Sequence, residues 1–481
     1  MNIKYLGHAG FKVTTSKGKV ILIDPWFGSA FFDSWYPYPD NTLLRSEAKN
    51  CDYVLISHEH EDHFDSMFLQ EVKANIIIPK YRSNSFRLKC EKKGIPFMEL
   101  EPRVRFSIDE FEFLFVIQSA PAWDDAAIIA IDTLNDEVFV NMNDMKPSAE
   151  DVDFIENNFK RIDILAYQFS GANWHPMCNQ EISQPDYDNI VSRKVLNKFN
   201  YTLSLLNTFR PKVAVPSAGP PIFLEKNKIR FNNSTIGVFP HISEYLKFVD
   251  NLEIDTSFKA LLPGDNLNSD TGRNINEDRD QIDESRLIKS ILNCGSLNSE
   301  RIVQYYYENW ADIGNFINVL NYKILYCVDK MEIMTNPKLG LVSFDSKEDY
   351  DLKLIVPIHV FSSIVDGENT WEEAFLSLNV TFDWRIPFNE YLVTYHKYLH
   401  SDYLKSYLKV LRDSVNREVF ELEVNGESLE IQRSCPHAQG DLSKGQIKDG
   451  CLVCPSHGWR FRLTDGVCLD SSARISIKKV N

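Results

Sequence analysis

Four residues near the C-terminus have the types and the spacing of metal ligands. They lie in the segments SCPHAQGDL and GCLVCPSHGWRF and are Cys435, His437, Cys454 and His457. Short alternating stretches that predict strands flank both segments, so each cysteine and histidine pair is expected at the tip of a loop. These four ligands suit a structural zinc ion, and they also suit a [2Fe–2S] cluster in which one iron takes two thiolates and the other two imidazoles.

The two loops resemble those of Rieske ferredoxins and ring-hydroxylating oxygenases, which contain CPH…GDL and CP.HGW.F followed by a turn with glycine. The resemblance implies a [2Fe–2S] cluster rather than zinc, with both cysteines on one iron and both histidines on the other. Imidazole ligands raise the reduction potential of such a cluster. The resemblance also implies a small all-β Rieske domain, which we expect over residues 413–481.

Nearby positions narrow the resemblance to one branch of the family. Respiratory Rieske proteins carry two further cysteines that form a disulfide beside the cluster, and the corresponding positions here are Gly440 and Ser456. The resemblance is therefore to the ferredoxin and oxygenase branch. Cys451 and Cys468 lie outside the ligand pattern, and we expect them to be buried as small apolar side chains.

A second group of ligand-type residues follows a predicted strand near the N-terminus. The segment SHEHEDHFD contains three histidines and an aspartate within six residues, namely His58, His60, Asp62 and His63. Imidazoles and carboxylates that crowd into one turn cost free energy unless something binds them. The segment therefore predicts a metal site rather than an ordinary polar loop.

The pattern HxHxDH is the signature of the metallo-β-lactamase fold, and LGHAGFKV with VILIDPW resembles the opening strands of its lactonase-like members. The resemblance implies an αββα sandwich, expected over residues 1–235. In that family one metal takes the first two histidines and a third, the other takes the Asp–His pair and a final histidine, and an aspartate bridges them. Asp62 is then both a ligand and a catalytic residue, and His8 and Asp24 are expected to support the metal loops.

The remaining ligand positions match the family only in part. The bridging aspartate corresponds to Asp144, at the end of the predicted strand in VFVNMND. Where relatives have their third histidine, this chain has SAPAWDDAA, which offers Asp124 or Asp125 instead. The final histidine is absent from VPSAGPP, unless His175 in SGANWHP replaces it. His175 is equally a candidate catalytic residue in the substrate pocket or a hydrogen-bonded loop histidine.

A dinuclear site with more carboxylates and fewer histidines favours iron, with manganese and zinc less favoured. A Rieske cluster carries one electron at a time and has no use in hydrolysis, whereas an oxygen-activating iron site needs electrons. The combination resembles the CMP-N-acetylneuraminate hydroxylases and the diiron β-hydroxylases of natural-product pathways. The resemblance implies a monooxygenase that uses O₂ and oxidises a carbon or a nitrogen of a small polar metabolite.

Two other functions stay open at this point. The N-terminal site could activate water as a lactonase or phosphodiesterase, with a Rieske domain that senses redox state. The chain could also be an electron-transfer protein whose N-terminal domain has lost catalysis, although the intact HEHEDH segment argues against that.

The elements that must position these residues alternate along the first 220 residues. Apolar runs predict strands, and longer amphipathic stretches predict helices. The expected strands are Val20–Ile23, Tyr53–Ile56, Ile76–Pro79, Phe113–Ile117, Ala127–Ile131, Val138–Val140, Ile162–Phe169 and Val213–Pro216, and the expected helices are Ala149–Lys160 and Tyr187–Phe209. Residues 236–412 predict a mixed α+β region of unknown role.

Length and composition limit the partners. A chain of 481 residues is too long for one hydrophobic core, so several domains are expected. Its net charge of −16 excludes a surface that binds nucleic acid. There is no GxGxxG after an apolar strand, so we expect an external electron donor: a ferredoxin, a flavoprotein reductase or a cytochrome. With no secretory signal and no apolar run near the roughly 20 residues that span a bilayer, we expect a cytoplasmic protein away from membranes.

Overall fold

The structure is a computed structural model that divides into two compact units. The first unit is Met1–Asn173 with Lys198–Lys289, and the second is Trp174–Asn197 with Ser290–Asn481. The residues that the structure describes are 1–119, 125–180, 182–267, 279, 297–313, 317, 320–345, 348–399, 404, 419–424, 426–433, 435–436, 440–455, 458–470 and 473–480.

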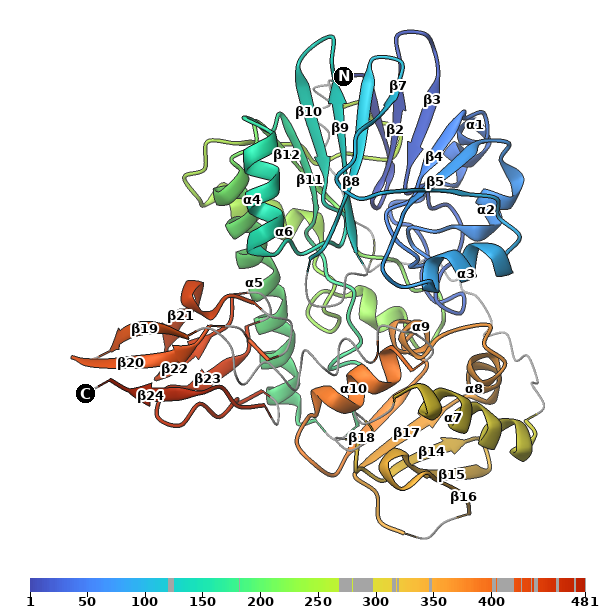
Figure 1. The fold of residues 1–481 in the computed structure, drawn as a ribbon, viewed down its shortest axis with the longest axis vertical. Helices are drawn as coiled ribbons and strands as arrows, with labels where there is room; N and C mark the ends of the chain where they lie inside the picture. Colours follow the sequence, from blue (N-terminus) through green and yellow to red (C-terminus); the bar gives the residue numbers. More distant parts are fainter. Residues whose placement is uncertain are drawn as a thin grey trace. The chain divides into compact units, whose positions relative to one another are not determined.

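Two sheets form the first unit (Figure 1). The first sheet has the order β1-β2-β3-β4-β5-β6, with the strands Ile3–Gly7, Gly10–Thr14, Val20–Ile23, Tyr53–Leu55, Asn75–Pro79 and Met98–Leu100. The second has the order β13-β12-β11-β10-β9-β8-β7, where β7 to β13 are Phe106–Ile108, Phe111–Ile117, Ala126–Asp132, Glu137–Asn141, Ile164–Gln168, Val213–Ser217 and Ser257–Phe258. Every strand that the sequence predicted is present, with ends shifted by a few residues.

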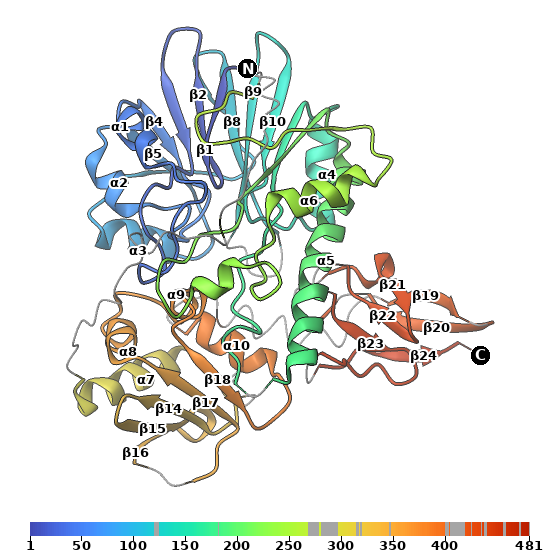
Figure 2. The same cartoon turned by 180° about the vertical axis from the view of Figure 1, so that it is seen from behind.

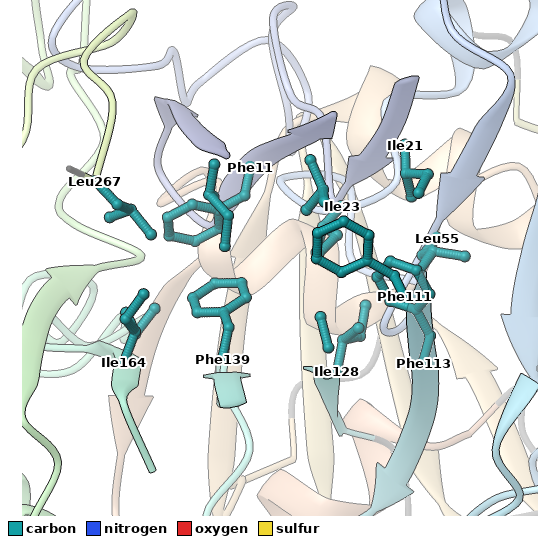
Figure 3. Packing of buried hydrophobic residues seen from close by; sticks show 14 of the residues in the cluster. Phe11, Ile21, Ile23, Leu55, Phe111, Phe113, Ile128, Phe139, Ile164 and Leu267 are labelled. Atoms are coloured by element: carbon teal, nitrogen blue, oxygen red, sulfur yellow. The ribbon is translucent and has the colours of Figure 1, made fainter. Parts of the chain in front are cut away.

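The two sheets pack face to face through one apolar core. Figure 3 shows Phe11 and Ile23 of the first sheet opposite Phe139 and Ile128 of the second. The rings of Phe11 and Phe139 meet edge to face, with their centroids 5.0 Å apart. Side chains alternate between the two faces of a strand, so Phe139 of β10 enters this core together with Ile164 and Ala166 of β11. The remaining residues of the strands face the helices.

Helices cover the outer faces of both sheets (Figures 1 and 2). The first sheet carries α1, Arg45–Ala48, α2, Ser66–Glu71, and α3, Ser85–Lys92. The second sheet carries α4, Ala149–Asn158, and α6, Ile242–Asp250. The 26-residue helix α5, Gln184–Phe209, contributes its residues up to Asn197 to the second unit and the rest to the first. The predicted αββα sandwich is thus confirmed.

A second apolar core lies between the first sheet and its helices. Leu22 and Val54 of the sheet pack there with Phe68 of α2 and Phe86 of α3. Asp65 begins α2, because its side chain accepts a hydrogen bond from the backbone N–H of Phe68 at 3.0 Å. This cap starts the helix directly after the HEHEDH loop and so fixes where the loop ends.

The middle of the chain contains a five-stranded sheet of order β16-β15-β14-β17-β18. Strands β14 to β18 are Ile324–Val328, Met331–Asn336, Leu341–Phe344, Leu352–Val356 and Thr381–Trp384. Helices α7 to α10 are Ser299–Ile313, Ile358–Val365, Trp371–Leu376 and Glu390–Lys397. The predicted mixed α+β character of this region is confirmed.

The C-terminal segment consists of two three-stranded sheets, β19-β20-β24 and β21-β22-β23. These strands are Val419–Val424, Glu427–Gln432, Gln446–Lys448, Cys451–Val453, Arg460–Arg462 and Ile477–Lys479. Short 3-10 helices occur at Thr42–Leu44, Ile229–Asn232, Pro337–Leu339 and Leu442–Lys444. Across the described part of the chain, no helix has both the length and the apolar character needed to cross a membrane.

Candidate metal centres

The HEHEDH loop begins where β4 ends, and Asp24 follows the end of β3. These two strands pair in parallel, with Ile23 opposite Leu55, so both segments emerge at the same edge of the first sheet. Asp24 has a φ of 41°, in the left-handed region that aspartate and asparagine tolerate better than most residues. The turn after β3 thereby brings a carboxylate beneath the histidine loop.

The Asp24 carboxylate orients two histidines of that loop. Its Oδ1 accepts the backbone N–H of Ser57 at 2.7 Å, and its Oδ2 accepts the Ser57 hydroxyl at 2.6 Å and Nδ1 of His63 at 3.1 Å. The Ser57 hydroxyl donates its only proton to Asp24. The Ser57 Oγ therefore accepts a hydrogen bond from Nδ1 of His58, at 2.9 Å. Both rings therefore carry their proton on Nδ1 and present the lone pair of Nε2.

Those lone pairs converge with carboxylate oxygens. The His63 Nε2 atom lies 3.6 Å from Asp144 Oδ1 and 3.8 Å from Asp62 Oδ2, and His58 Nε2 lies 3.8 Å from Asp125 Oδ1. These separations exceed hydrogen-bond length. Two ligand atoms that are each ~2.1 Å from one ion lie about 3–3.5 Å apart, so the atoms are spaced nearly as they would be around a metal.

Three overlapping groups of side chains have their ligand atoms within 4.8 Å of one another. They share His58 and His63, so they form one continuous cluster rather than separate sites. The groups are His8 with Asp62 and His63, His58 with His60 and Asp125, and His58 with His63 and Asp144.

Three polar atoms of this cluster are buried and have no hydrogen-bond partner among the described residues: His58 Nε2, His63 Nε2 and Asp144 Oδ1. An unsatisfied buried polar group costs about 1–3 kcal/mol. Three of them at one point indicate that the cluster is built around something that satisfies all three together. The donor set of imidazole nitrogens and carboxylate oxygens fits one or two divalent transition-metal ions.

The electrostatics agree with that fit. Burial lowers the pKa of His58 well below its ordinary value, and the neighbouring His63 and His60 lower it further, so His58 is a neutral imidazole, the form that can bind a metal. Burial also disfavours the charged form of His63, but Asp62, Asp144 and Asp24 outweigh it and raise the pKa of His63 well above its ordinary value. The pocket of carboxylates around His63 thus favours a positive charge where a metal would sit.

The structure brings most of the predicted metal residues together, namely His58, His60, Asp62, His63 and Asp144, together with Asp125 as the carboxylate beside His58 and His60. Asp124 lies outside the described residues. His8, expected as a supporting residue, contacts Asp62 directly through Nε2 at 3.1 Å. Which of these residues bind metal stays a prediction.

His175 belongs to the second unit, not to the unit that holds the metal cluster. Its Nδ1 accepts from the Asn179 side-chain amide at 2.9 Å, and the neighbouring Trp174 stacks on Phe382 with ring centroids 4.1 Å apart. Burial and the charge of Lys194 lower the pKa of His175 to about 3. His175 is thus a neutral histidine at physiological pH, and its catalytic role stays a prediction.

The two predicted cluster cysteines, Cys435 and Cys454, are 1% and 2% exposed and pack in the apolar core of the C-terminal segment. Their backbone N–H groups donate to the carbonyls of Gly440, at 2.9 Å, and Trp459, at 2.8 Å, which closes each loop on itself. His437 and His457 lie outside the described residues. Thiols at the tips of two closed loops fit the thiolate half of a [2Fe–2S] cluster.

Helix α5 lies against the second of these loops. A β-carbon placed on Gly458 would come 1.7 Å from Asn197 Nδ2, so the Asn197 side chain occupies the space beside that glycine. One turn earlier, Arg193 pairs with Asp470 at 3.0 Å, and Asp470 also accepts hydrogen bonds from the backbone N–H, Nε and Nη2 of Arg460. Sequence analysis missed these contacts, because nothing in a charged helical stretch indicates what it packs against.

Comparisons with known proteins agree with both halves of the chain. Residues 2–133 match the family model of the beta-lactamase superfamily domain, and residues 391–480 match that of the Rieske [2Fe-2S] domain. The chain joins a metallo-β-lactamase-fold domain to a Rieske domain. The predicted combination of domains is therefore confirmed.

Relatives of this two-domain chain cover either its whole length or one part. A Rieske 2Fe-2S iron-sulfur protein of Mycobacterium tuberculosis is 28% identical over 98% of both chains. A metal-dependent hydrolase of Caldivirga maquilingensis is 31% identical over 19% of this chain and 36% of its own. Among solved structures, the diiron β-hydroxylase CmlA from Streptomyces venezuelae has a TM-score of 0.37 and 13% identity over 55% of this chain and 53% of its own.

Proposed function

We propose that this chain is a Rieske-coupled non-haem diiron monooxygenase, a hydroxylase or N-oxygenase that acts on a small polar metabolite such as a nucleotide sugar or a natural-product intermediate. The observation that carries the proposal is one chain with a Rieske domain and a metal cluster in which Asp125 stands beside His58 and His60. A Rieske cluster transfers single electrons, and a hydrolase has no use for them. A carboxylate in place of an imidazole makes the site harder and favours iron over zinc.

In this proposal the residues divide between two ions. His58, His60 and Asp125 would hold one, and Asp62 and His63 would hold the other, with Asp144 available to both. Two irons bound there would supply the redox chemistry for O₂ and substrate, and a Rieske cluster would supply the electrons from an external donor. Asp24 keeps the Nε2 lone pair of His63 directed at the site, and the Asp62 carboxylate is held by His8.

Metal analysis of protein purified without oxygen tests the proposal. We expect about four irons per chain, two as a Rieske cluster and two as a separate dinuclear species with its own Mössbauer signal. Two irons with two zincs would overturn it.

Variants of the metal residues give a second test. His58→Ala and Asp144→Ala should abolish substrate-dependent O₂ consumption and leave the Rieske absorption spectrum unchanged, because the two centres lie on separate domains. Asp153→Ala, on the exposed face of α4, is the matched control and should retain activity. Turnover that survives both metal-site variants would place the active site elsewhere.

A metal hydrolase is the second candidate, a lactonase or phosphodiesterase in which the Rieske domain senses redox state. The 31% identity with the Caldivirga metal-dependent hydrolase over 93 residues favours it. Such an enzyme would hold zinc and keep its activity without O₂. Reduction of the Rieske cluster would change only its affinity for the substrate. The same metal analysis separates it from the oxygenase.

A further inference from the structure

A buried lysine reaches the carboxyl edge of the second sheet, where the metal residues Asp125 and Asp144 also lie. Lys198 is on α5, and its Nζ donates a hydrogen bond to the side-chain oxygen of Gln168, the last residue of β11. The same ammonium stands 5.7 Å from the ring centroid of Tyr201, one turn further along α5. Both residues belong to the unit that contains the metal cluster.

Gln168 and Ser217 face the layer between the two sheets. They are register partners at the ends of the parallel strands β11 and β12, and they lie two residues beyond Ala166 and Val215, which are part of the inter-sheet core. Because side chains alternate along a strand, all four point to the same face. The residue after Ser217 donates its N–H to the carbonyl of His8 at 2.8 Å, so this end of β12 adjoins the loop whose histidine holds Asp62.

Two hydroxyls of this group are buried and unused. Ser217 Oγ and Tyr201 OH have no hydrogen-bond partner among the described residues. Each can donate a hydrogen bond, and neither finds an acceptor within the part of the chain that the structure describes. The Lys198 ammonium links the two, because it bonds to Gln168, the register partner of Ser217, and stands beside the Tyr201 ring.

No carboxylate among the described residues lies in direct contact with Lys198. The ammonium makes no ion pair with any described residue, and burial with repulsion from Lys146 lowers its pKa to about 7. The carboxylates of Asp125 and Asp144 act on it from a distance and favour its charged form. Metal ions at the cluster would neutralise those two carboxylates. The burial of the Lys198 ammonium is therefore not explained by a role as their counter-charge.

We propose that Lys198, Tyr201 and Ser217, with Gln168 orienting the lysine, bind an anionic group of the molecule that reacts at the metal centre, a carboxylate or a phosphate. An ammonium and two hydroxyl donors in a buried place are the usual complement of such a group. The inference rests on the proposed function for the identity of the reaction, and it names the class of substrate: one with an anion a short distance from the atom that is oxidised.

Anion binding to the full-length protein, with its Rieske cluster intact and zinc at the dinuclear site, tests this by titration calorimetry with acetate, inorganic phosphate and neutral acetamide. We expect one of the two anions to bind and acetamide not to bind, and the tighter anion identifies the substrate group. Lys198→Met should weaken that binding by about tenfold at unchanged metal content. The matched control Lys247→Met, on the exposed side of α6, should not change it. If Lys198→Met binds the anion as tightly as the unaltered protein, or if neither anion binds, the inference is overturned.

Tyr201→Phe provides an independent readout. The variant should weaken anion binding by about threefold and leave the melting temperature of the ligand-free protein equal or higher, because the hydroxyl has no partner to lose. A lower melting temperature with unchanged anion binding would assign the hydroxyl a structural role and contradict the inference. These measurements need neither iron at the dinuclear site nor O₂, so they stand or fail separately from the oxygenase proposal.

Discussion

Asp24 and His63 are joined by a hydrogen bond of 3.1 Å from Nδ1 of the ring to the carboxylate, and both side chains are fully buried. The bond fixes the tautomer, so that Nε2 faces Asp144 at 3.6 Å. A carboxylate behind a ligating histidine holds the ring in place and raises its basicity. Asp24 thus holds His63 in the orientation in which its Nε2 atom could bind a metal.

Asp24→Asn should lower metal affinity about 10- to 100-fold and leave the Rieske spectrum intact. Asparagine tolerates the left-handed backbone at this position but cannot accept bonds from Ser57 and His63 with both oxygens. The measurement is competition for zinc with a chelator of known affinity. Asp109→Asn is the matched control, since Asp109 also has a left-handed φ, of 53°, and pairs with the exposed Lys17. Equal zinc affinity in the two variants would contradict the role of Asp24.

Gly458→Ala should disturb the second cluster loop. The new β-carbon would collide with Asn197, and the left-handed φ of 71° costs an alanine about 1–2 kcal/mol. We expect a lower yield of cluster-loaded protein and a shifted Rieske absorption or EPR spectrum. Adding Asn197→Ala removes the collision and leaves the backbone strain, so the double variant should recover part of the yield. No recovery would show that strain alone is responsible.

Asp470→Asn should destabilise the second unit by about 2–3 kcal/mol, because Asp470 accepts charged bonds from Arg193 and Arg460 in a nearly buried place. The α5 segment that carries Arg193 should then become more sensitive to limited proteolysis. Asp465→Asn removes a comparable pair with Arg462, at 3.0 Å, but that pair is exposed and screened by solvent, so its loss should have a much smaller effect. Similar losses in the two variants would contradict the prediction.

His396 should make the middle region sensitive to acid. Burial lowers its pKa to about 4, while Nδ1 donates to Leu392 O at 2.6 Å and Nε2 accepts from Tyr326 OH at 2.8 Å. The unfolded chain takes up a proton below pH ~6.5 that the folded chain does not, so the free energy of unfolding falls as pH drops from ~6.5 to 4, by about 3 kcal/mol in total.

Urea unfolding at several pH values measures this. His396→Gln should be less stable at pH 7, because it loses both hydrogen bonds, yet its stability should depend less on pH between ~6.5 and 4. An unchanged slope in the variant would assign the acid sensitivity to other groups.

Much of the candidate chemistry could be predicted from sequence because it is local. The HEHEDH segment places four ligand-type side chains in one loop after a buried strand. The CxH and CxxH pairs each place one cysteine and one histidine in a loop. Residue types and short spacings define a coordination set before any long-range contact forms. The apolar runs likewise predicted β3, β5 and β8 because strand periodicity is a property of neighbouring residues.

Residues that are distant in sequence were decided only by the tertiary structure. Asp125 and Asp144 join the histidines because β9 and β10 pair antiparallel, so the start of one and the end of the other share an edge. Lys198 looks in sequence like any lysine of a charged helix, and only folding brings it to Gln168. Parallel strands such as β11 and β12 pair through long crossovers, so the residues that meet at their carboxyl edge come from separate parts of the chain. The short motifs thus determined the Rieske domain and the candidate ligands of the metal site, and the sheet topology determined what else lies beside them.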